Sequence, residues 1–93
     1  MTKNKNISDL RREIDRIDSE LIRLLRERLH VAEAIGDIKK RKNLPVIDAR
    51  RESILNQRLK SLTDSDLLTR DFVEELWKLI IAESHRVQKE EID

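Results

Sequence analysis

The sequence contains no cysteine, and it has only two histidines, His30 and His85. A disulfide framework and a thiolate zinc site are therefore both excluded. The two histidines have no second ligand at a metal-binding spacing, and we expect both to lie at the surface. We predict that the protein holds no metal.

Glycine and aromatic residues are almost as scarce. One glycine, Gly36, is too few for a glycine-rich loop that cradles phosphate. Phe72 and Trp77 are the only aromatic residues, which is too few for a base-stacking surface. Charged residues make up 42% of the chain, but the net charge is only +1, so nothing general favours nucleic acid or an acidic membrane surface. We expect no nucleic-acid partner and no membrane partner.

Long apolar runs are absent too, and no stretch approaches the length of a membrane-spanning helix. Residues 1–6 are polar, with no apolar run behind their charges, so we expect them to be disordered and not to be a signal peptide. With 93 residues, the chain is long enough for one small domain, residues 1–93. We expect a cytoplasmic protein.

What the sequence does contain is an apolar stripe with alternating spacings of three and four residues. Such a stripe is typical of a long helix that packs along one side. It consists of Ile7, Leu10, Ile14, Ile17, Leu21, Leu24, Val31, Ile35 and Ile38. We predict a first helix over about residues 7–41, capped by Asn6 or Ser8, with Gly36 as its only weak point. A chain this short cannot cover so long a stripe, so we expect an oligomer.

Two shorter helices are expected after the first. Pro45 ends the first helix, and Asp48 is a good N-cap for a second helix over about residues 49–61. A polar turn over residues 63–66 separates it from a third helix over about residues 67–90. No segment alternates with the period of a strand. The expected fold is all-α, with three helices that are long, short and medium in order.

The stripe of the first helix is interrupted by a charge. Arg28 occupies the position where the next apolar residue is due. Lys39 lies eleven residues after Arg28, which places it within about 20° of the same helix face and about 16 Å further along the helix axis. These two cations could clamp a ligand with negative groups at both ends. Alternatively, Arg28 pairs with a carboxylate of the second helix and Lys39 extends into solvent at a helix end. These residues alone leave both interpretations open.

Other polar residues lie on faces that we expect to point inward. Glu52 shares a stripe with Leu55, where its carboxylate could bind a ligand hydroxyl or pair with a cation of the first helix. Ser84 and Gln88 continue the face of Ile81 on the third helix. An unpaired buried amide costs about 1–3 kcal/mol, so these groups need partners if they are buried. Simple helix capping, and a helix end that emerges into solvent, remain open alternatives.

Taken together, these residues resemble the all-helical class of chorismate mutases. The similarity is closest to the mutase domain that begins the bacterial bifunctional prephenate dehydratases, and it extends from about Leu10 to Gln88. It rests on the order and spacing of the polar residues along three helices of these lengths. The matching elements are Arg11, Arg28, Lys39, the turn Asp48-Ala49-Arg50-Arg51-Glu52 and the stretch Ile81-Ala82-Glu83-Ser84-His85-Arg86-Val87-Gln88.

The resemblance implies an intertwined homodimer, a helical bundle with two identical sites. Each site would convert chorismate to prephenate by an intramolecular Claisen rearrangement, a step of aromatic amino-acid biosynthesis that needs no cofactor. In the pattern of this family, Arg11 and Arg28 hold the carboxylates of the substrate. Lys39 and Gln88 donate hydrogen bonds to the ether oxygen, where negative charge builds as its bond to carbon breaks. These four residues are the expected catalytic residues.

The same resemblance implies roles for the residues around them. Glu52 and the backbone of Asp48 would bind the ring hydroxyl, and Ser84 would contact the ring carboxylate. Arg51 would support the turn at the start of the second helix. The expected apolar walls are Ala32, Ile35 and Ile81.

Helix geometry adds an argument for the dimer. Arg11 lies about 25 Å from Arg28 along a straight helix and is turned about 100° away. Two side chains so placed cannot reach one small ligand from the same helix. A site that contains both needs Arg11 from a second chain.

Two alternatives remain. One is an isochorismate pyruvate-lyase on the same fold, although such enzymes usually lack the turn from Asp48 to Glu52 that is intact here. The other is a non-catalytic helical dimerisation module, which would leave Arg28, Glu52 and Gln88 without a function. The chain ends just after the third expected helix, so we expect a monofunctional enzyme.

Overall fold

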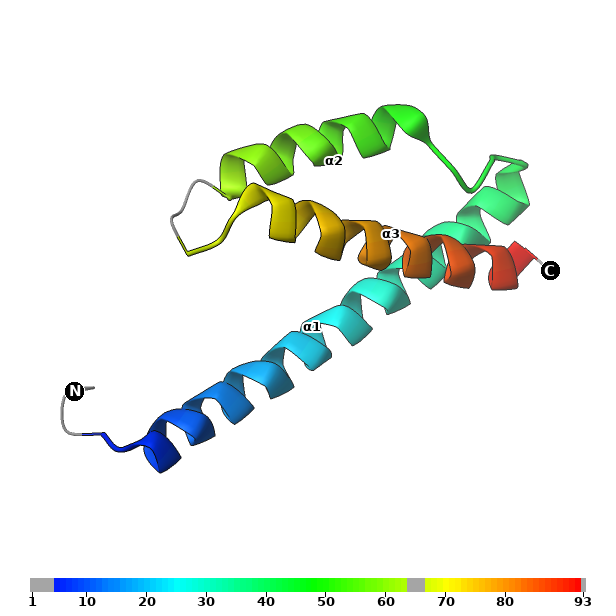
Figure 1. The fold of residues 1–93 in the computed structure, drawn as a ribbon. Helices are drawn as coiled ribbons and strands as arrows, with labels where there is room; N and C mark the ends of the chain where they lie inside the picture. Colours follow the sequence, from blue (N-terminus) through cyan, green and yellow to red (C-terminus); the bar gives the residue numbers. More distant parts are fainter. Residues whose placement is uncertain (1–4, 64–66, 93) are drawn as a thin grey trace.

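The computed structural model describes residues 5–63 and 67–92, and every regular element in these ranges is a helix. Helix α1 spans Ile7–Lys42, α2 spans Ala49–Leu62 and α3 spans Arg70–Ile92. The predicted all-α fold with a long, a short and a medium helix is therefore confirmed (Figure 1).

Side-chain and backbone caps set both ends of α1. Asn6 is the N-cap: its side chain accepts a hydrogen bond from the Asp9 backbone N–H, and the Asp9 carboxylate accepts one from the Asn6 N–H. This reciprocal capping box satisfies two backbone donors that would otherwise lack partners. At the other end, Asn43 adopts a left-handed conformation with φ of 56°, and its N–H donates to the Lys39 and Lys40 carbonyls. The helix thus ends at Lys42, one residue after the expected end.

The starts of α2 and α3 are also capped by side chains. Asp48 is the N-cap of α2, as expected, because its carboxylate accepts a hydrogen bond from the Arg51 N–H at 3.1 Å. Helix α3 begins at Arg70, and its expected start near residue 67 is wrong. The Thr69 hydroxyl accepts a hydrogen bond from the Phe72 N–H at 3.3 Å, and this cap fixes the start of the helix. The expected polar turn falls partly on residues 64–66, outside the described residues.

Helix α3 packs across the C-terminal half of α1, while α2 runs beside α3 with few contacts (Figure 1). The crossing of α1 and α3 buries small residues on both helices, together with the longer Gln88. Ala32 and Gly36 are buried on α1, and Ser84 and Gln88 are buried on α3. Small side chains let two helix backbones approach closely, and Gly36 lies directly against the backbone of Gln88 here.

The N-terminal half of α1 extends away from the other helices (Figure 1). The molecule measures 57 × 24 × 17 Å, and its radius of gyration is 17.2 Å. A compact domain of this length has a radius of gyration of about 12 Å. The apolar stripe of α1 is between 39% and 65% exposed at Ile7, Leu10, Ile14, Ile17, Leu21, Leu24, Val31, Ile35 and Ile38. One chain therefore leaves its longest apolar surface uncovered.

Candidate active site

A cavity of about 430 Å³ lies where α1, α3 and the start of α2 meet. Every expected site residue except Arg11 lines it, although those residues are spread over three helices. The expected lining residues are Arg28, Ala32, Ile35, Lys39, Asp48, Arg51, Glu52, Ile81, Ser84 and Gln88. The cavity has four further lining residues, Val31, Val46, Leu55 and His85.

Lys39 and Gln88 form a direct pair at one end of the cavity. The Lys39 ammonium donates hydrogen bonds to the Gln88 side-chain oxygen at 2.7 Å and to the Val46 carbonyl at 2.6 Å. An ammonium carries three N–H donors, so one remains for a ligand. The Gln88 side chain accepts from Lys39 through its oxygen, so its amide NH₂ group points elsewhere and can donate to a ligand. Two polar donors therefore converge at this end.

Arg28 lies toward the other end of the same strip, as a half-buried cation. Its guanidinium donates to the Ser84 hydroxyl, and that hydroxyl donates in turn to the Ile80 carbonyl at 3.0 Å. Burial lowers the pKa of Arg28 from its usual value, and the nearby charge of Arg51 lowers it further. Within the described residues, no carboxylate lies within ion-pair distance of Arg28. The alternative in which Arg28 pairs with an acid of the second helix is therefore not found in this chain.

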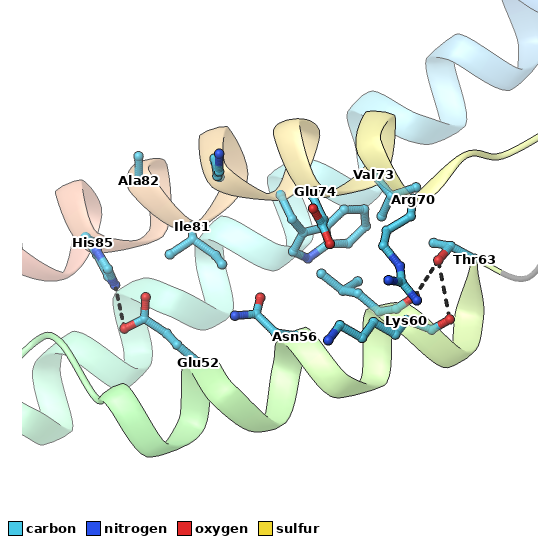
Figure 2. A pocket seen from close by; sticks show the side chains of 13 residues that line it. Glu52, Asn56, Lys60, Thr63, Arg70, Val73, Glu74, Ile81, Ala82 and His85 are labelled. Atoms are coloured by element: carbon cyan, nitrogen blue, oxygen red, sulfur yellow. Dashed lines mark hydrogen bonds and ion pairs between the residues drawn. The ribbon is translucent and has the colours of Figure 1, made fainter.

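Glu52 faces His85 across the space between α2 and α3 (Figure 2). The Glu52 carboxylate lies 3.8 Å from Nε2 of His85, close enough for an ion pair when the imidazole is protonated. The expected surface position of His85 is wrong: the side chain is 23% exposed and lines the cavity. Sequence reasoning missed it because only histidine spacing was considered. The sequence did indicate this position, since His85 lies four residues after Ile81 and therefore on the same face of the helix.

A second groove, of about 610 Å³, continues from the cavity along the gap between α2 and α3 (Figure 2). Its apolar part includes Leu59, Val73 and Trp77, and charged side chains such as Lys60 and Glu74 also line it. The groove and the cavity share Glu52, Ile81 and His85. Anything that fills the groove therefore reaches the edge of the cavity.

Arg11 is the one expected site residue that lies outside the cavity. It is exposed on the N-terminal half of α1, in the part that no other helix covers (Figure 1). Along a helix, it is about 25 Å from Arg28. A single chain therefore brings together Arg28, Lys39 and Gln88, but not Arg11.

The cavity has the chemistry of a site for a small dianion that also carries a hydroxyl. Two cations, Arg28 and Lys39, face one apolar strip that includes Ala32 and Ile35. Glu52 supplies a hydrogen-bond acceptor, and Gln88 supplies a neutral donor beside Lys39. No group of three or more metal-ligating side chains occurs among the described residues. In the same part of the chain, no helix is long and apolar enough to cross a membrane.

Residues 10–89 match the family model described as chorismate mutase type II. This match covers most of the chain, including every lining residue named above. The chain belongs to the chorismate mutase type II family. The similarity expected from the order of the polar residues is therefore confirmed.

The family relatives include free-standing and fused proteins. The chain is 34% identical to the bifunctional chorismate mutase/prephenate dehydratase of Escherichia coli K12 over 89 residues, which are 96% of this chain and 23% of that protein. It is 43% identical to the protein of the same name from Aquifex aeolicus over 58 residues, 62% of this chain and 16% of that protein. The chorismate mutase of Methanocaldococcus jannaschii is 22% identical over 89 residues, 96% of this chain and 90% of that protein.

The chain spans less than a quarter of the length of the bifunctional relatives it matches. No solved structure gives a significant match to the chain.

Proposed function

We propose that this protein is a chorismate mutase, which converts chorismate to prephenate by an intramolecular Claisen rearrangement in aromatic amino-acid biosynthesis. In this reaction the ether C–O bond breaks and a C–C bond forms within one molecule, so no atom is gained or lost. The observation that carries the proposal is the pair of cations, Arg28 and Lys39, which face one cavity with Gln88 and without a carboxylate partner in the described residues.

The substrate supplies the charge that this cavity lacks. Chorismate has two carboxylates, and one of them would bind Arg28, whose charged form burial disfavours in the free protein. Lys39 and the Gln88 amide would donate to the ether oxygen as negative charge develops there. Donors fixed in advance at such a position lower the barrier more than they stabilise the substrate. The ring hydroxyl would bind Glu52 and the backbone of Asp48, with Arg51 supporting this turn.

The proposal needs neither a nucleophile nor a cofactor. The cavity would hold the flexible enolpyruvyl arm over the ring in a reactive shape, between walls that include Ala32, Ile35 and Ile81. Ser84 holds Arg28 in place and would meet the ring carboxylate together with it.

The working unit that we propose is an intertwined homodimer. The accessible surface of the chain is 7877 Å². A compact monomer of this mass exposes only about 5,700 Å², so about 2,200 Å² is in excess. A standard interface buries about 800 Å² per partner, and permanent homodimers bury more. A second copy that covers the apolar stripe of α1 accounts for an excess of this size.

In this dimer, we place the N-terminal half of the partner's α1 in the groove between α2 and α3. The groove offers apolar residues such as Trp77 to an apolar stripe, and it leads to the cavity through Ile81 and His85. An α1 that lies there can bring its own Arg11 to the cavity from across the two-fold axis. Each site would then combine Arg28 and Lys39 of one chain with Arg11 of the other.

The test is turnover of chorismate by the purified protein. We expect loss of chorismate absorbance and prephenate as the product, identified by NMR because substrate and product have the same mass. Release of pyruvate from isochorismate, measured with lactate dehydrogenase, would instead identify the lyase. If the protein turns over neither compound, the proposal is overturned, and a non-catalytic dimerisation module is the remaining interpretation.

Lys39→Ala is the informative variant in the same assay. Removing one donor at the developing charge typically lowers kcat about 100-fold or more. The variant also loses a hydrogen bond to the Val46 carbonyl, which costs about 1 kcal/mol of stability, so a thermal melt and the dimer mass must be measured beside kcat. A kcat near that of the wild type in Lys39→Ala would contradict the role of Lys39.

A cytoplasmic location belongs to this proposal as well. The chain has no cysteine, so its folding does not depend on disulfide formation in an oxidising compartment. Cell fractionation with an antibody to the protein would test it.

A further inference from the structure

Gly36 is the one glycine of the chain, and it lies inside α1, six residues before the helix ends at Lys42. Its backbone is ordinary helix and does not need the conformational freedom of glycine, because its φ is not positive. Glycine inside a helix is destabilising relative to alanine. The local conformation therefore gives no reason for glycine at this position.

The reason lies on α3. A Cβ atom placed on Gly36 would stand 2.8 Å from the Cα of Gln88, 3.1 Å from its carbonyl oxygen and 3.2 Å from its Cβ. Two carbon atoms normally approach to about 3.5 Å, so α3 would have to move by about 0.7 Å at this point. The nearest atoms are backbone, and a rotamer change cannot relieve the contact.

The residue that this contact positions is the one that pairs with Lys39. Gly36 precedes Lys39 by one helical turn on the same helix, and it touches the backbone of Gln88. The side chains of Lys39 and Gln88 then meet at 2.7 Å. One close backbone approach therefore fixes both donors relative to each other.

We infer that Gly36 is a positioning residue for the mutase reaction: the absence of a side chain there sets the placement of the Gln88 amide against Lys39 and the substrate ether oxygen. This inference rests on the proposed function. Arg28 lies two turns away along α1, about 12 Å, so the binding of the carboxylate is affected less than the reactive end. Glycine at this position weakens α1 locally, but it allows the close approach of α3 that defines the geometry of the site.

Steady-state kinetics of Gly36→Ala test the inference. Misplacing a reacting group by about 1 Å can cost about 100-fold in rate, so we expect kcat to fall about 10- to 100-fold while KM changes less than about threefold. Asp37→Ala is the matched control, because it also favours helix at the next position but lies exposed beside Arg41. It should keep kcat within about twofold of the wild type.

A double-mutant cycle separates positioning from general damage. Once Gln88→Ala has removed the amide, adding Gly36→Ala should lower kcat little further, because the group that it displaces is gone. If Gly36→Ala lowers kcat by the same factor in the Gln88→Ala background as in the wild type, then Gly36 does not act through Gln88. That result would overturn the inference. Wild-type kcat in Gly36→Ala would overturn it as well.

A second variant covers the case in which Gly36→Ala does not fold. Gln88→Asn shortens the side chain by one methylene, which moves the amide away from Lys39 and adds no atom near Gly36. We expect the same fall in kcat as in Gly36→Ala, with little change in KM. An unchanged kcat in Gln88→Asn would mean that the placement of the amide is unimportant, which contradicts the inference. A wild-type protein without mutase activity is a different result, because it rejects the proposed function first and the inference with it.

Discussion

Arg28 carries its charge in surroundings that disfavour it. Burial and the charge of Arg51 both lower its pKa, and its hydrogen-bond partner is the neutral hydroxyl of Ser84. For a base, a lowered pKa in the folded state means that folding works against the protonated form. This cost is present at every pH below the lowered pKa, and arginine stays protonated in proteins. An anionic ligand bound at Arg28 would relieve it at ordinary pH.

Arg28→Met should therefore separate stability from function. Methionine keeps much of the apolar volume of arginine and removes the disfavoured charge, so Tm of the free protein should stay the same or rise. The difference in Tm between variant and wild type should not change across neutral pH, because arginine does not titrate there. KM for chorismate should rise at least about tenfold, because a charge-assisted bond to a carboxylate is lost. Thermal melts at two pH values and steady-state kinetics check both expectations. A large fall in Tm would mean that Arg28 is needed for the fold itself.

The role proposed for Gln88 predicts how activity depends on pH. A neutral amide donates without titrating, so we expect the activity of the wild type to persist across neutral pH. In Gln88→Glu, only the protonated carboxyl can donate to the ether oxygen, and glutamic acid has a reference pKa of about 4.3. That variant should lose about 100-fold in kcat at neutral pH and recover toward acid pH, whereas Gln88→Ala stays low throughout. A wild type that requires acid pH would contradict this role of Gln88.

At the scale of the elements, local sequence determines where each helix starts. Asn6 with Asp9 caps α1, Asp48 caps α2 and Thr69 caps α3. Two of these caps could be predicted from the sequence, because a short polar side chain directly precedes an apolar periodic stretch. The start of α3 was misplaced because residues 63–69 contain several possible caps.

The caps of α1 and α3 offer a matched pair of variants. Asn6→Ala and Thr69→Ala should each cost about 1 kcal/mol, visible as a fall in Tm of about 4–8 °C. Asn6 lies one turn before Arg11, so fraying there should also raise KM for chorismate if Arg11 belongs to the site. Thr69 does not line the cavity, so its variant should change KM less than Asn6→Ala does. An equal effect on KM in both variants would remove the link between the start of α1 and the site.

At the scale of the whole molecule, one chain leaves its longest apolar surface exposed. A radius of gyration of 17.2 Å and an uncovered α1 stripe are what we expect of one half of the proposed homodimer. The few contacts between α2 and α3 support the same proposal, because the groove between these helices is open and partly lined by apolar residues.

Mixing two inactive variants tests whether the site spans the dimer. If Arg11 acts across the two-fold axis, a dimer of one Arg11→Ala chain and one Lys39→Ala chain has one complete site. Random association gives about half mixed dimers, so about a quarter of the wild-type activity should return. Each variant alone is the control, and sedimentation should give twice the mass of the chain. No recovery in confirmed mixed dimers would place Arg11 in the site of its own chain or outside it.

The sequence alone determined the three helices and the cation in the apolar stripe, because apolar period and side-chain caps act over a few residues. It also placed Arg28, Lys39 and Gln88 on faces that could meet. The tertiary structure decided which groups do meet: Gln88 with Lys39, Ser84 with Arg28, and His85 with Glu52. The first two contacts depend on how closely α1 and α3 approach at Gly36, and the third depends on how α2 lies beside α3. Each of these distances is a property of two helix surfaces together.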